Sequence, residues 1–256
     1  MTLERLKKIL DYKKTHTAEI ESDISSFCNM IELPNLDGFR NVFEIVKLYL
    51  KEKKYYVIRF PLKDNEIGAF VYKGDAVSYL VINTSVPVGN TNFAFCHELY
   101  HIFFSDNEDE MRANQFAANL LMPYAEFRRM FLKFKSAFDN TSETEEEKQL
   151  NIIVFLMNYF NVPFMAAYIR CYEFDLFKDP VKFLDVKKEI ISLAFDKLWF
   201  DKTLLEPSKI DDSKQLMQFL KETGKEYAER GYINSRTLEK ALDNTKKLFT
   251  KIKAGE

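Results

Sequence analysis

Two of the chain's three histidines stand four residues apart around a glutamate, in the stretch FCHELYH at residues 95–101. The apolar spacing of residues 91–104 predicts a helix, which projects the imidazoles of His97 and His101 side by side, about 40° apart, with the Glu98 carboxylate flanking them. The apolar residues of this stretch, Cys96 included, cover a different side of the helix, which we expect to face a core. The two histidines are therefore not on the most apolar side.

The spacing of these three residues suits a metal ion. Two imidazoles one helical turn apart can share one Zn²⁺ at about 2.0–2.1 Å each, which leaves room for a third protein ligand and a water molecule. Glu98 projects at an angle that does not suit a ligand, but its carboxylate can reach that water and accept its proton. This is the arrangement of the H-E-x-x-H motif. The alternative is a polar stripe on an amphipathic helix that binds no metal.

A third ligand has to come from the acidic stretch that follows, because the third histidine lies in a predicted exposed helix near the N-terminus. The candidates are Asp106, Glu108, Asp109 and Glu110. On a helix over 109–121, Glu110 and Asn114 share a stripe with small alanines, which let two helices approach to about 8–10 Å. We therefore expect Glu110 as the third ligand and Asn114 as the acceptor of the free ring N–H of His97. The alternative role for Glu110 is helix capping, three residues after Asn107 as the N-cap.

The periodicity of apolar residues changes twice along the chain. Helical spacing at about 2–31 and 37–52 gives way to short β-branched and aromatic runs at 55–60, 68–72 and 77–83, and it returns from about 91 onward. Lys73-Gly74-Asp75 is typical of a hairpin turn, so we expect a small, mainly antiparallel sheet. The predicted fold class is α+β, with an N-terminal helical segment (1–34), a central domain (35–178) and a helical C-terminal extension (179–256).

Charge and cysteine content narrow the class of protein. A formal net charge of -2 does not favour a nucleic-acid surface, so direct nucleic-acid binding is not expected. The three cysteines are odd in number and widely separated, which argues against a secreted disulfide framework and for a reducing compartment. Neither a signal peptide nor a run of about eighteen apolar residues is found, so we expect no membrane span and a cytoplasmic location.

The stretch FAFCHELYH, followed at 110–123 by the pattern ExxANxFAxxLLMP, resembles the ImmA/IrrE family of zinc metallopeptidases, which are H-E-x-x-H zincins of gluzincin-like type. Residues 153–174 are similar to the helix-turn-helix-like segment of that family, and the resemblance covers about 35–175. It implies a zincin-like fold with one Zn²⁺ per chain, held by His97, His101 and Glu110, and Glu98 as the general base. It also implies a protein substrate, since members of the family cut helix-turn-helix repressors encoded beside them in mobile elements or stress loci.

Two features of the substrate site stay open at this stage. Tyr100 occupies a position that is commonly glycine in HELGH motifs, and Tyr100 and Tyr124 are the candidates for stabilising the oxyanion, because a phenol hydroxyl can donate to developing negative charge. An extended substrate commonly lies along a sheet edge facing the metal. We expect that edge to be the strand before the metal helix, formed by Ser78, Tyr79, Leu80, Val81, Ile82 and Asn83.

The leading hypothesis is a zinc-dependent endopeptidase that cleaves a specific intracellular protein, such as a helix-turn-helix repressor. The alternative from another class is a metal-containing regulatory protein that sequesters a repressor or an antitoxin-like partner without cutting it. Glu98 favours the enzyme, because a pure binder needs no base beside the metal. A third hypothesis, DNA binding through 153–174, is weaker because this segment is rich in Phe, Met and Ile, which suits burial in a core better than a recognition helix that needs polar and basic tips.

Overall fold

The computed structural model describes residues 1–32, 42–73, 78–104, 109–139, 141–177 and 183–254. The strands are β1 (Tyr55–Phe60), β2 (Ala69–Lys73) and β3 (Ser78–Asn83). The helices are α1 (Leu3–Thr15), α2 (Thr17–Met30), α3 (Val42–Glu52), α4 (Val88–Phe103), α5 (Glu110–Leu121), α6 (Tyr124–Phe138), α7 (Glu145–Phe160), α8 (Phe164–Glu173), α9 (Lys188–Lys197), α10 (Ser213–Glu229) and α11 (Ser235–Ala254), with a 3-10 helix η1 (Lys202–Leu205). This order confirms the α+β class, because helices both precede and follow the three strands in the sequence.

The sheet is mixed, which corrects the expectation of a mainly antiparallel one. Its strand order is β1-β3-β2, with β3 in the centre, parallel to β1 and antiparallel to β2. After β1 the chain crosses to the opposite edge of the sheet, where it forms β2, and it then returns as β3 between the other two strands. As a result, β3 runs in the same direction as β1. Alternation of apolar residues predicts a strand but says nothing about its direction. The predicted hairpin joins β2 to β3, and its turn at Gly74 and Asp75 lies outside the described residues.

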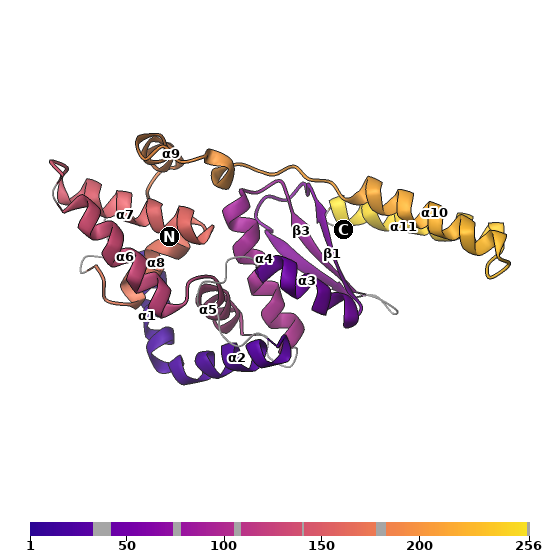
Figure 1. Cartoon of the computed structure of the whole chain (residues 1–256), viewed down its shortest axis with the longest axis horizontal. Helices are drawn as coiled ribbons and strands as arrows, with labels where there is room; N and C mark the ends of the chain where they lie inside the picture. Colours follow the sequence, from indigo (N-terminus) through magenta and orange to yellow (C-terminus); the bar gives the residue numbers. More distant parts are fainter. Residues whose placement is uncertain (33–41, 74–77, 105–108, 140, 178–182, 255–256) are drawn as a thin grey trace.

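Each face of the sheet is covered by different helices. Leu80 and Ile82 of β3 pack with the buried side of α4 and with Leu50 of α3 in one hydrophobic core. Val81 points to the other face, where it packs with Phe249 of α11 in a second, smaller core. Figure 1 shows the hairpin of α10 and α11 starting at this face and projecting away from the rest of the chain. The sheet therefore supports α4 on one side and anchors the C-terminal hairpin on the other.

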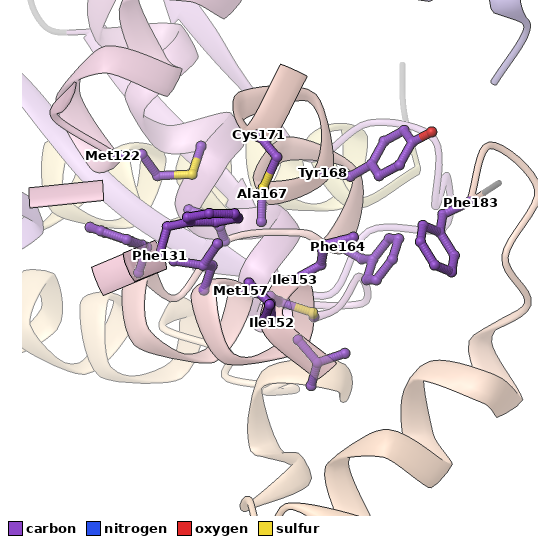
Figure 2. Close-up of a cluster of buried hydrophobic side chains, with 14 of the residues drawn as sticks. Met122, Phe131, Ile152, Ile153, Met157, Phe164, Ala167, Tyr168, Cys171 and Phe183 are labelled. Carbon is purple, nitrogen blue, oxygen red and sulfur yellow. The ribbon is translucent and has the colours of Figure 1, made fainter. Parts of the chain in front are cut away.

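A third core lies among α6, α7 and α8 and also includes apolar residues of α1, α9 and η1. Figure 2 shows its side chains, with Met122, Phe131, Met157, Ala167 and Phe183 among those labelled. The predicted helix-turn-helix-like segment corresponds to α7 and α8, which meet at an angle of 110°. Most of the apolar side chains of this pair are buried in the core, as expected if the segment does not read DNA.

The predicted segment boundaries at 34/35 and 178/179 stay predictions, because residues 33–41 and 178–182 lie outside the described ones. Within the described residues, the N-terminal helices contribute Leu6 and Phe27 to two different cores. The C-terminal region also divides its contacts: Phe195 packs with α6–α8, whereas Phe249 packs on the sheet. Both terminal regions are therefore joined to the central domain through buried apolar contacts.

No single helix in the described parts of the chain is long and apolar enough to cross a membrane. Taken together, α7 and α8 have the length and apolar composition of a membrane span, but the chain bends sharply between the two helices.

Candidate metal centre

Two helices carry the predicted ligands. The apolar side of α4 is buried, with Phe95 and Leu99 at most 2% exposed, and this leaves His97 and His101 partly exposed on the other side. Glu110 is the first residue of α5. The alanines expected between the helices are buried, because Ala113 and Ala117 are 0% exposed. The small-residue stripe thus lets α5 lie against α4, with the ligand-bearing end of α5 next to the two histidines.

The cap of α5 differs from the prediction. The Asp109 side chain accepts from the backbone N–H groups of Met111 and Arg112 at 2.9 and 3.1 Å, so Asp109 is the N-cap and Glu110 is the first helical residue. Asn107, the predicted N-cap, lies outside the described residues, as do Asp106 and Glu108. With Asp109 engaged in capping, Glu110 has no capping role to perform and its carboxylate is available as a ligand.

The three predicted ligands lie together. The Nε2 atoms of His97 and His101 are 3.2 Å apart, and the Glu110 carboxylate oxygens lie 3.1 Å from His97 Nε2 and 3.4 Å from His101 Nε2. Ligand atoms placed tetrahedrally at about 2.0–2.1 Å from a zinc ion are separated by about 3.3 Å. The three residues therefore form a group able to hold a metal ion, and the separations of their ligand atoms suit an ion of the size of Zn²⁺.

Asn114 contacts the ring nitrogen of His97 that is not part of the ligand group. The side-chain N–H of Asn114 donates to the Glu110 backbone carbonyl at 2.8 Å, and because a carbonyl only accepts, the amide oxygen of Asn114 faces His97 Nδ1 at 3.2 Å. That oxygen accepts the proton of Nδ1, which leaves the lone pair of Nε2 facing the ligand group. Burial lowers the pKa of His97, which favours the neutral, metal-binding imidazole.

Glu98 is half-buried beside the ligands. Its pKa is raised to about 7: burial contributes most, the nearby Glu110 carboxylate also raises it, and a hydrogen bond from the backbone N–H of Val71 opposes both effects. A carboxyl group with a pKa near neutrality can both take up and release a proton at the pH of a cell. The sequence motif indicated the position of Glu98. It gave no signal for Val71, because that contact uses a backbone group brought close by packing.

The edge strand beside Glu98 is β2, and the prediction for residues 78–83 is wrong. Because β3 pairs with β1 on one side and β2 on the other, its backbone groups have no free edge. Asn83 N–H donates to Gly68 O, and the bonds of an antiparallel ladder recur at every second residue. Val71 and Lys73 therefore turn their backbone groups away from β3. A Cβ atom on Gly68 would come within 2.7 Å of Ala94 Cβ, so this glycine lets the start of β2 approach α4.

Neither tyrosine is placed to stabilise an oxyanion. Tyr100 is 1% exposed and packs against Phe104 and Phe116 in the core, and burial raises its pKa to about 12. Tyr124 is exposed, but it follows the C-terminal end of α5, whereas Glu110 begins that helix, and twelve helical residues span roughly 18 Å. The Tyr100 ring is enclosed by the core, which its position on a helical wheel did not reveal.

A helix with the H-E-x-x-H pattern, facing a second helix that supplies a glutamate, defines a zincin-like metallopeptidase site. Residues 50–172 match the peptidase M78 family model, described as the IrrE N-terminal-like domain. Over these residues the chain is therefore similar to the IrrE family, which confirms the predicted resemblance. Comparison with curated proteins and with solved structures gave no match.

Proposed function

We propose that the chain is a zinc-dependent endopeptidase. The observation that carries this proposal is the position of Glu98, whose carboxylate flanks the group of His97, His101 and Glu110 and accepts a hydrogen bond from the Val71 backbone N–H. A carboxylate held there serves no purpose in metal retention, since the ligand set is complete without it. The three buried cysteines are free, which agrees with action in a reducing compartment such as the cytoplasm.

The residues divide the chemistry among them. His97, His101 and Glu110 would hold the zinc ion, which would supply a Lewis acid for the substrate carbonyl and lower the pKa of water. Glu98 accepts a proton from the attacking water and returns it to the amine as the peptide C–N bond breaks and the new C–O bond forms. The Val71 N–H orients the Glu98 carboxylate during both transfers. Asn114 keeps His97 in its ligand tautomer.

The substrate is proposed to bind as an extended strand along β2. Val71 and Lys73 turn their backbone groups to the side of β2 that does not face β3, where the Val71 N–H bonds to Glu98 and the Val71 C=O and the Lys73 backbone groups are directed toward a bound peptide. A peptide added to this edge gains main-chain hydrogen bonds, and it passes beside the ligand group in an orientation set by the strand. This geometry requires an unfolded or locally opened segment in the substrate, because a helix cannot add to a sheet edge.

For the substrate we propose a helix-turn-helix repressor encoded next to this chain, on the basis of family kinship. The test is to incubate the zinc-loaded protein with the purified repressor and to measure intact masses. We expect two fragments whose masses add up to that of the repressor plus one water, and no fragments when a chelator is present. When the repressor binds the Glu98→Gln variant, the backbone amides of β2 should exchange hydrogen more slowly than in the unbound variant, because the bound segment is proposed to pair with this strand. A repressor that stays intact, or that is cut equally well with the chelator, would contradict the proposal.

A further inference from the structure

The N-terminal helices, which precede the family-matched residues, contact the end of α5 that carries Glu110. Figure 1 shows α1 and α2 passing beneath α5. Glu110 is the first residue of its helix, and its side chain is 71% exposed. The first turn of a helix has unsatisfied backbone groups and frays readily. A ligand at this position therefore depends on whatever holds the helix end in place.

The first contact joins α1 to the cap of α5. The Tyr12 hydroxyl donates to one carboxylate oxygen of Asp109 at 2.5 Å, and the other oxygen of Asp109 accepts the capping bonds from Met111 and Arg112. Tyr12 is itself held by stacking on the ring of His16, with ring centroids 4.1 Å apart. One carboxylate thus connects a rigid side chain of α1 to the backbone turn that contains Glu110.

The second contact joins α2 to the same turn. Arg112, two residues after Glu110, donates two hydrogen bonds to the carboxylate of Asp23, at 2.6 and 2.9 Å, and one to Glu19 at 3.1 Å. Both the Arg112 and Asp23 side chains are largely buried, with 21% and 11% exposed. A two-bond arginine–carboxylate pair fixes orientation as well as distance, so it limits rotation of the first turn of α5.

We propose that α1 and α2 form a positioning element for the metal centre, in which Tyr12 and Arg112 hold the first turn of α5 so that Glu110 faces His97 and His101. Tyr12 and Arg112 are positioning residues, since neither touches the ligand atoms. The proposal rests on the metal site of the proposed function. It extends the working site beyond residues 50–172, to helices whose sequence carries no motif for this role.

The test uses the full chain and measures the zinc dissociation constant by competition with a chromophoric chelator, together with the thermal midpoint of the metal-free protein. We expect Tyr12→Phe and Arg112→Ala each to weaken zinc binding about 10- to 100-fold, the range for residues that support metal ligands from outside the coordination shell. The matched controls are Tyr227→Phe and Arg230→Ala, whose side chains lie in the exposed C-terminal hairpin. They should bind zinc as the wild type does.

A background lacking the third ligand separates positioning from general stability. In Glu110→Ala, adding Tyr12→Phe should weaken the remaining zinc affinity no further, because the ligand it positions is already gone. Equal zinc affinity for wild type, Tyr12→Phe and Arg112→Ala overturns the positioning role while leaving the proposed function intact. A Tyr12→Phe effect that persists undiminished in the Glu110→Ala background also overturns it. If Arg112→Ala does not fold, Tyr12→Phe decides the matter.

The two proposals can fail separately. A wild type that holds zinc with the expected variant pattern, yet cuts no repressor, refutes the peptidase and supports the positioning element. A wild type that retains no zinc refutes both.

Discussion

Glu98→Gln is expected to abolish peptide cleavage while leaving zinc content and thermal stability near those of the wild type. Glutamine has the shape of glutamate and can still accept the Val71 N–H bond, but it cannot take a proton from water. Positioned proton transfer contributes about 10²–10⁴-fold to rate, and cleavage should fall by that factor. The measurement is the initial rate of repressor cleavage by intact mass at equal zinc loading.

The same variant decides between cutting and sequestration. Binding of the repressor to Glu98→Gln should survive, because none of the three ligands is altered. The control is Glu146→Gln, a glutamate of α7 that is exposed and remote from the ligands, which should cut as the wild type does. If Glu98→Gln relieves repression in cells as fully as the wild type while the repressor stays intact, the protein acts by sequestration and the peptidase assignment is wrong.

Arg170→Ala is expected to destabilise the fold by about 3–5 kcal/mol, the range for breaking a buried ion pair from one side. Arg170 is 1% exposed, and it donates to Glu173 at 2.7 Å, to the Met122 carbonyl at 3.1 and 3.0 Å, and to Asn119 at 2.8 Å. Its removal leaves the Glu173 carboxylate buried without its cation and the C-terminal end of α5 without its donor. Denaturant unfolding of metal-free protein measures the change.

Arg230→Ala serves as the control, since its partner Glu226 is also exposed and lies one turn away on the same helix surface. Its unfolding midpoint should barely move. An Arg170→Ala midpoint equal to that of this control would show that the bonds from Arg170 to Asn119 and Met122 do not hold α5 against α8.

Much of the metal centre could be predicted from local sequence. His97, Glu98 and His101 share one helix, so their relative directions follow from helical geometry alone. Glu110 and Asn114 also share a helix, and the small alanines near them, Ala113 and Ala117, predicted how that helix meets α4. These inferences needed only residue spacing and side-chain size, and the distances among the three ligands agree with them.

Inferences that depended on long-range packing were less successful. The order β1-β3-β2 leaves β2 at the edge, but the strand patterns of all three runs are alike, and no residue of 78–83 reveals its central place. Tyr100 projects near His97 on a helical wheel, yet the neighbouring aromatic rings enclose it. Tyr12 and Asp109 are 97 residues apart, and only the path of α1 past α5 brings them together.

The central claim is that His97, His101 and Glu110 hold one zinc ion, and elemental analysis of protein purified without a histidine tag tests it most directly. We predict about one equivalent of zinc in the wild type, since three protein ligands and a water form the usual open catalytic set. His101→Ala should lose the metal, together with the stability that zinc binding adds to the fold. Less than about a tenth of an equivalent in the wild type after incubation with zinc, with His101→Ala no different, would contradict the account.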